Sequence, residues 1–77
     1  MSEQPHYSML IEWSDSDSAY PVTLPEWEGR VFNPIAHGDT YQEAVAHGQE
    51  VLTLLLAAAR EEGVATPSPR VFAASTV

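Results

Sequence analysis

The sequence predicts a small α+β domain with the element order β-β-β-α-β, a small antiparallel-type sheet with one helix packed on a face. Two stretches of alternating apolar and polar residues predict the first strands, because successive side chains of a strand point to opposite faces. A later stretch repeats apolar residues at helical spacing between a start signal and a stop signal. A chain of 77 residues has room for a single domain.

The first two strands are predicted at residues 6–13 and 19–24. The odd-numbered residues of the first stretch are apolar and would share one face, so we expect Trp13 in the core. The serines and aspartates at 14–18 favour a hairpin turn, because their side chains bond their own backbone. Pro21 has no N–H to donate, which predicts that it lies on a sheet edge or at a non-bonded position.

A loop at residues 25–29 and a weaker third strand at Arg30–His37 follow. Asn33-Pro34 interrupts this strand, which predicts a bulged or split element. Trp27 lies in the loop, where a tryptophan either caps the edge of the core or stands exposed as a contact residue. Interfaces are enriched in such aromatic side chains.

The helix is predicted from Thr40 to Gly63. Thr40 is a good N-cap, Glu43 completes a capping box, and Gly63 is a typical stop. Small residues early in the helix would let its first turns approach the sheet closely. The predicted apolar stripe is Ala44, Gly48, Val51, Leu52, Leu55, Leu56 and Ala59.

A short last strand is predicted at Arg70–Ala74, after a connection stiffened by two prolines. The predicted domain covers residues 6–74. Residues 1–5 are expected to form a disordered N-terminal tail, and residues 75–77 a C-terminal tail.

The charge balance is acidic: eleven Asp and Glu stand against three Lys and Arg, for a formal net charge of −8. Such a surface repels nucleic acids and anionic membranes and favours basic partners, although solubility alone also explains it. The chain has no cysteine, which excludes disulfides and thiolate metal sites. A domain this small gains support from other chains, so we expect a homo-oligomer or a complex.

No catalytic site, metal site or cofactor is predicted, and we expect a protein that is not an enzyme. The histidines lack the spacing of a metal-binding helix, and the carboxylates of the hairpin loop are explained by turn formation. The exposed acidic residues and the loop tryptophan are instead the candidates for partner binding. These residues are Asp15, Asp17, Glu26, Trp27 and Glu28.

Four segments in order carry a family resemblance: 7–13, 19–25, Gly29, and Gly38-Asp39-Thr40-Tyr41-Gln42-Glu43-Ala44. Together they resemble the N-terminal domain of HicB-type antitoxins over roughly residues 7–72. The resemblance implies a partial ribonuclease-H-like fold, self-association, and binding to a small basic HicA-type toxin that cleaves RNA. A cytoplasmic location is expected because the N-terminus does not read as a signal peptide and cysteine is absent. The matched residues look structural, and they are Pro25, Gly29, Gly38, Asp39, Thr40, Glu43 and Ala44.

The chain departs from the family in two places. It ends five residues after Phe72, which leaves no room for the C-terminal DNA-binding segment of many HicB antitoxins, so direct DNA binding is not expected. The stretch 30–37 is longer than in the family and alters the surface offered to a partner. Two other interpretations remain: an orphan homo-oligomeric regulatory or structural module without a toxin, and a metal-dependent nuclease.

Overall fold

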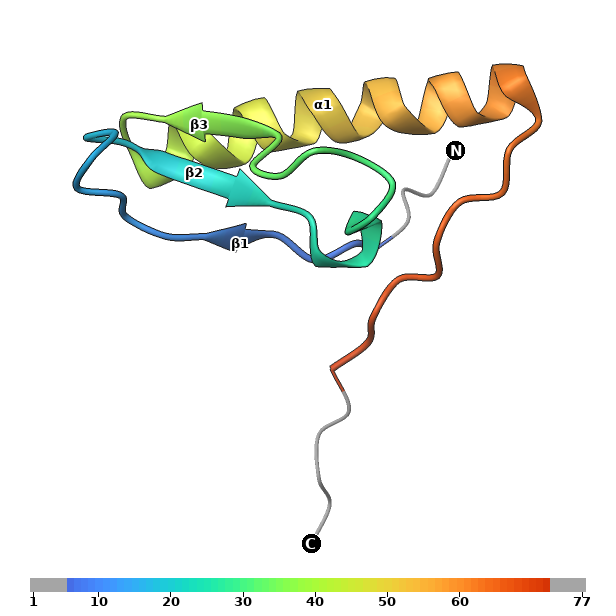
Figure 1. The fold of residues 1–77 in the computed structure, drawn as a ribbon, viewed down its shortest axis with the longest axis horizontal. Helices are drawn as coiled ribbons and strands as arrows, with labels where there is room; N and C mark the ends of the chain where they lie inside the picture. The colour runs from blue at the N-terminus through green and yellow to red at the C-terminus, as the bar shows by residue number, and fades with distance from the viewer. Residues whose placement is uncertain (1–5, 73–77) are drawn as a thin grey trace, which may run out of the picture.

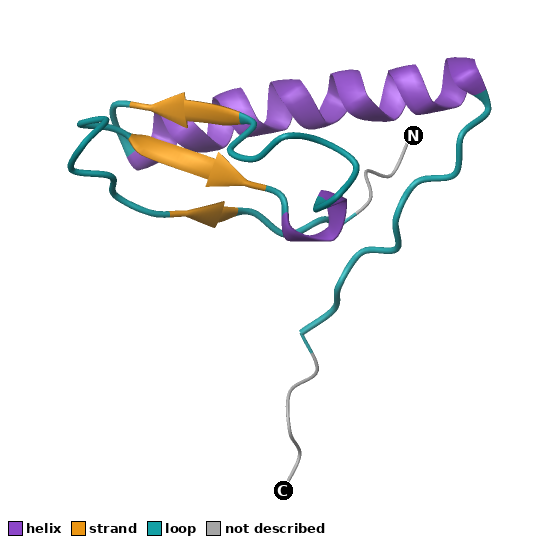
Figure 2. Ribbon diagram, viewed as in Figure 1, coloured by secondary structure: helices purple, strands orange, loops and turns teal. Residues whose placement is uncertain are grey.

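The computed structural model describes residues 6–72, which form a three-stranded antiparallel sheet with one helix packed against it (Figure 1). The predicted α+β class is therefore confirmed, and β2 is the central strand of the order β1-β2-β3. The tails expected at 1–5 and 75–77 lie outside the described residues. The elements, coloured by type in Figure 2, are β1 (Leu10–Ile11), β2 (Tyr20–Thr23), a 3-10 helix (Pro25–Trp27), β3 (Ala36–Gly38) and α1 (Tyr41–Glu62).

The predicted hairpin is confirmed, although β1 is much shorter than the stretch 6–13. Ile11 pairs with Val22, and an isolated bridge joins Ser14 to Ala19 in the same register. Pro21 lies in the central strand, so of its two predicted placements the sheet edge is wrong. Its carbonyl accepts a 3.4 Å bond from the backbone of Glu12, but its nitrogen has no hydrogen to return, which limits the ladder beside β1.

The third strand begins only at Ala36, so the prediction of a strand from residue 30 is wrong. Residues 30–35 form a loop whose backbone bonds are made elsewhere: the N–H groups of Arg30 and Val31 both donate to the carbonyl of Trp27. The side chain of Asn33 accepts a 3.1 Å bond from the N–H of Leu24. The loop rejoins the central strand at Ile35, whose N–H donates to the carbonyl of Val22 at 2.8 Å.

Helix α1 begins and ends where its signals predict. The backbone N–H of Glu43 donates to the hydroxyl of Thr40 at 3.1 Å, and the Glu43 carboxylate accepts from the N–H of Asp39 at 2.9 Å. Gly63 ends the helix in the left-handed conformation (φ +67°), which glycine adopts without strain. Among residues 6–72, no helix has the length and apolar character needed to cross a membrane.

The first turns of α1 lie directly on the sheet, as the small residues predict. A Cβ atom built on Gly38 would lie 2.2 Å from the backbone nitrogen of Ala44, so the end of β3 touches the helix backbone itself. At Gly48 a Cβ would meet Met9 and Val22 at 3.1 Å. These close approaches fix the position of the helix on the strands.

The core lies further along the helix and is built by side chains. Leu24, Trp27 and Leu52 form its buried centre. Trp13 is 53% exposed, so its expected place in the core is wrong. The partly buried residues packed around the centre are Tyr7, Met9, Val31, Ile35, Leu55 and Leu56.

The predicted fourth strand is absent from residues 70–72, and 73–74 lie outside the described residues. After α1 the chain runs away from the helix end as an extended segment (Figure 1). Val71 and Phe72 are 81% and 90% exposed, so burial of their side chains does not hold this segment against the sheet. The prolines at 67 and 69 also lack the N–H that a ladder needs.

Candidate functional site

The five predicted partner-binding residues do not form one site. Asp15 and Asp17 lie on the hairpin turn that precedes β2, whereas the 3-10 helix carries Glu26 and Trp27 after β2 (Figure 1). We call the first region the turn end and define it as residues 12–20 with the β3–α1 junction, residues 38–43. The opposite region, residues 24–35 with 60–72, is the strap end.

At the turn end, both aspartates of the hairpin are bonded within the turn. The Asp17 carboxylate accepts from the hydroxyl of Ser14 at 3.1 Å, and that hydroxyl accepts from the N–H of Asp17 at 3.3 Å. The Asp15 carboxylate accepts from the indole N–H of Trp13 at 2.6 Å. All four residues of these contacts lie within one hairpin, so both carboxylates are bonded inside the turn. The predicted bond to the backbone of the turn is made by the Ser14 hydroxyl and not by the aspartates.

At the strap end, Glu26 joins three segments of the chain. Its carboxylate accepts from the backbone N–H and the hydroxyl of Ser8, and from the N–H of Arg70 at 2.8 Å. Burial opposes ionisation and is the largest single influence on this group, but the bonds from Arg70 and Ser8 together lower its pKa below the ordinary value. Glu26 is therefore a structural clamp, and its oxygens are already occupied.

Two further bonds hold the segment after α1 against the body. The hydroxyl of Tyr7 donates to the carbonyl of Pro67 at 2.5 Å, and the guanidinium of Arg30 donates to the carbonyl of Ala65 at 2.8 Å. We call residues 64–72 the strap. It is held by polar bonds, since its large apolar side chains are exposed.

Trp27 is 5% exposed, so the alternative in which it stands free as a contact residue is wrong and the core alternative is right. Tyr7 packs edge-on against its ring at 5.5 Å between centroids. Its indole N–H is buried without a hydrogen-bond partner among the described residues. Glu28, the next residue, is exposed and remains available at the surface.

The residues that matched the family motif have structural positions. Pro25 starts the 3-10 helix, and Gly29 follows it with a φ of +87°. Gly38 and Ala44 form the close contact between β3 and α1, while Asp39, Thr40 and Glu43 cap the helix.

Sequence reasoning missed a row of three aromatic rings at the turn end. Trp13 packs edge-on against Tyr20 at 5.1 Å, and Tyr20 packs against Tyr41 at 4.4 Å. We call these three residues the aromatic row. Tyr20 is half-buried in the middle, while Trp13 and Tyr41 are 53% and 60% exposed.

The register of the hairpin predicts one of the two ring contacts in this row, the contact between Trp13 and Tyr20. Pairing Ser14 with Ala19 places Trp13 directly opposite Tyr20, where aromatic side chains on neighbouring strands stack. The contact with Tyr41 depends on where the first turn of α1 lies, which strand alternation does not predict. That turn covers Tyr20 and leaves Trp13 outside the core.

The charges are divided between the two ends. The turn end carries five carboxylates and no arginine, whereas the three arginines of the chain lie at the strap end, beside four carboxylates. The turn-end carboxylates are Glu12, Asp15, Asp17, Asp39 and Glu43.

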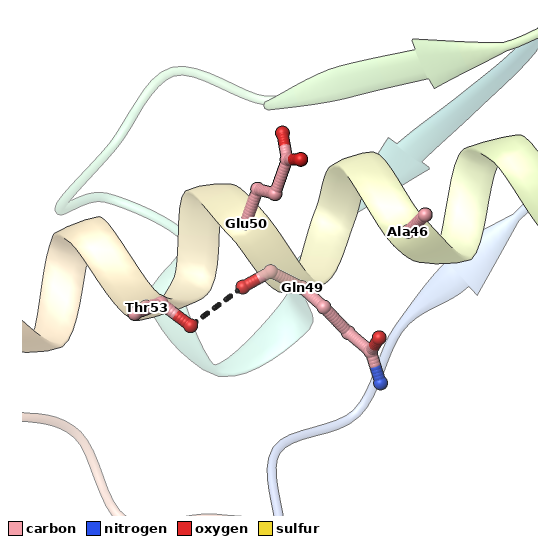
Figure 3. Close-up of a pocket in the computed structure, with 4 residues that line it drawn as sticks. All are labelled: Ala46, Gln49, Glu50 and Thr53. Atoms are coloured by element: carbon pink, nitrogen blue, oxygen red, sulfur yellow. Dashed lines mark hydrogen bonds between the residues drawn. The ribbon is translucent and has the colours of Figure 1, made fainter.

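Other surfaces show no converging chemistry. A shallow depression on the outer side of α1 is lined by Ala46, Gln49, Glu50 and Thr53 (Figure 3). The hydroxyl of Thr53 is bonded to the backbone of Gln49, and the side chains of Gln49 and Glu50 point in different directions (Figure 3). Within residues 6–72, no group of three or more histidines and carboxylates is placed to hold a metal ion.

One of the histidines has a structural contact. The Nδ1 atom of His47 lies within hydrogen-bond distance of the carbonyl of His37, which joins α1 to the outer edge of β3. This contact occupies part of the sheet edge that β3 forms.

Comparison of the chain with protein-family models, with curated proteins and with solved structures finds no match. Function is therefore inferred from the surface chemistry of the molecule and from the resemblance carried by its sequence.

Proposed function

We propose that the chain is a protein-binding module of the HicB antitoxin type, which neutralises a small basic HicA-type RNA-cleaving toxin by binding it in the cytoplasm. The observation that carries this proposal is the turn end, where five carboxylates lie without any arginine. The ordered sequence motifs supply the family, and the β-β-β-α order of the described residues is compatible with it.

The proposed mechanism is steric and electrostatic, and no chemical step is assigned to this chain. A toxin that binds RNA presents a basic surface to the phosphates of its substrate. An acidic module competes for that surface, and long-range attraction between the two proteins speeds their encounter. Covering the surface then prevents RNA from reaching the toxin.

The test is capture of partners from the native host with the tagged full chain, at low and at moderate salt, read by mass spectrometry. We expect a small basic protein encoded beside this gene, with weaker recovery at the higher salt because screening reduces the attraction. Co-expression of the chain should also restore growth of cells that make that protein. Capture of no basic protein under either condition would contradict the proposal.

An orphan homo-oligomeric module is the second candidate, and exposed apolar side chains at the strap end favour it. Phe32 is 97% exposed on the loop before β3, and Phe72 is 90% exposed on the strap. Sedimentation equilibrium of the purified chain tests this candidate. A defined oligomer that dissociates in the Phe32→Ser variant, with no partner captured, would favour it over the antitoxin.

A further inference from the structure

The aromatic row brings together rings from three parts of the fold, and its two outer rings are exposed. Trp13 follows β1, Tyr20 lies in β2, and Tyr41 is the first residue of α1. The two outer rings remain more than half exposed even though each packs against Tyr20. Because Gly38 of β3, which pairs with Tyr20, lies against the backbone of the helix start, the rings are held in place before any partner arrives.

Carboxylates lie close to this row along the chain, and one of them contacts it. Asp15 is bonded to the indole of Trp13. Tyr20 pairs with Gly38, which Asp39 follows. Aromatic rings attract cations through their electron-rich faces, and carboxylates beside them add a second attraction of the same sign.

This combination of rings and charges selects the occupant. A second copy of the chain would place five more carboxylates against the five already there, and nucleic acid or an anionic membrane would be repelled. An uncharged apolar partner would leave the nearby carboxylates without a counter-charge. A polypeptide rich in arginine or lysine satisfies both parts of the surface, and arginine fits best because its planar group stacks on aromatic rings.

We infer that the aromatic row is the docking surface for arginine side chains of a basic protein partner. The inference rests on the proposed function and deepens it, since it names the end of the molecule and the rings that hold the partner. Trp13 and Tyr41 contact the guanidinium groups, and Tyr20 holds both rings in position. The turn-end carboxylates supply steering and salt dependence.

The test measures binding of an amidated hexa-arginine peptide to the full chain by calorimetry at two salt concentrations. The Trp13→Ala and Tyr41→Leu variants keep the net charge of −8, so any loss of affinity comes from the rings. We expect each to weaken binding by about 3- to 10-fold, the range of a cation–π contact. Tyr41→Phe keeps a ring and should bind as the unaltered chain does.

Phe32→Ala is the matched control, because it removes an exposed aromatic ring at the strap end. We expect its affinity for the peptide to be unchanged. Equal binding by the unaltered chain, Trp13→Ala and Tyr41→Leu would overturn the inference, as would an equal loss in Phe32→Ala or no binding by the unaltered chain. Circular dichroism of each variant shows whether it folds. Trp13→Ala and Tyr41→Leu each remove one outer ring, so either variant tests the row if the other does not fold.

The captured partner separates this inference from the proposed function. A basic protein that binds Trp13→Ala and Tyr41→Leu as tightly as the unaltered chain would leave the function standing and overturn the docking surface. Peptide binding that depends on the rings, without any captured basic protein, would leave the docking surface standing and overturn the proposed function. Self-association of the chain that disappears in Trp13→Ala would assign the row to a second copy and overturn the inference.

Discussion

The two ends of the molecule are held together in different ways. At the turn end, backbone touches backbone: the last residue of β3 lies against the first turn of α1, and glycine is required there. At the strap end, the packing is made by large side chains around Trp27 and by polar bonds to the strap.

The two ends therefore differ in what they do: the strap end packs side chains into the core, and the turn end presents side chains at the surface. The turn end has little core of its own, yet it holds an aromatic row and five carboxylates at the surface in a fixed arrangement. The strap end buries its tryptophan and uses Glu26 and Arg30 for internal bonds. Substitutions at matched residues of the two ends can therefore break or sharpen this comparison.

The two tryptophans should differ most. Trp27→Ala removes a ring that is 5% exposed and should lower the free energy of unfolding by about 3–5 kcal/mol, the usual cost of a large cavity. Trp13→Ala removes a ring that is 53% exposed and should cost about 1 kcal/mol, mainly its edge-on contact with Tyr20. Urea unfolding measures both. Equal losses would show that the buried and exposed rings are wrongly assigned.

Two glycines test the backbone contact at the turn end. Gly38→Ala would drive a methyl group into the nitrogen of Ala44, so we expect a loss of about 3 kcal/mol, at the upper end for overpacking. Gly63→Ala at the helix end meets no atom within 4 Å and should cost about 1 kcal/mol through its positive φ alone. Thermal unfolding of the two variants compares them, and a Gly63→Ala loss as large as that of Gly38→Ala would contradict the close contact.

The smallest expected effect is the loss of stability on acidification that comes from the bonds between Glu26 and the strap. Because the pKa of Glu26 is lowered in the folded chain, its contribution is present above the ordinary glutamate pKa and is lost as pH falls through the folded value. Glu26→Gln should remove this dependence and cost about 1 kcal/mol at neutral pH, since solvent screens a partly exposed carboxylate.

Unfolding measured from pH 7 to pH 3 tests this prediction, with Glu28→Gln as the control. Glu28 is the exposed neighbour of Glu26, and its substitution should leave the acid dependence unchanged. A Glu26→Gln variant that loses stability on acidification as steeply as the unaltered chain would show that the clamp does not depend on its charge.

Local signals in the sequence predicted the helix and the hairpin. Contacts between distant segments determine the structure of the remaining stretches, which the sequence did not predict. Thr40, Glu43 and Gly63 specify the helix because capping and termination act within one turn. The strand predictions for 30–35 and 70–72 are wrong. The N–H groups of Arg30 and Val31 bond the carbonyl of Trp27, and the N–H of Arg70 bonds the carboxylate of Glu26, which alternation cannot anticipate.

The candidate surface was predicted only in part. Asp15 and Asp17 were singled out by charge; Asp15 contacts Trp13 of the aromatic row, whereas Asp17 is bonded to Ser14 within the turn. Glu26 and Trp27 were grouped with them by composition, but one side chain is a clamp and the other is core. Burial and bonding distinguish these residues, and neither can be read from residue type alone.

The most direct test of docking at the turn end is hydrogen exchange of the full chain, alone and in complex with the basic protein that it captures. The account predicts slower exchange in residues 12–20 and 38–43 on binding, with residues 24–35 and 64–72 unchanged. Protection confined to the strap end, with the turn end exchanging as in the free chain, would contradict it.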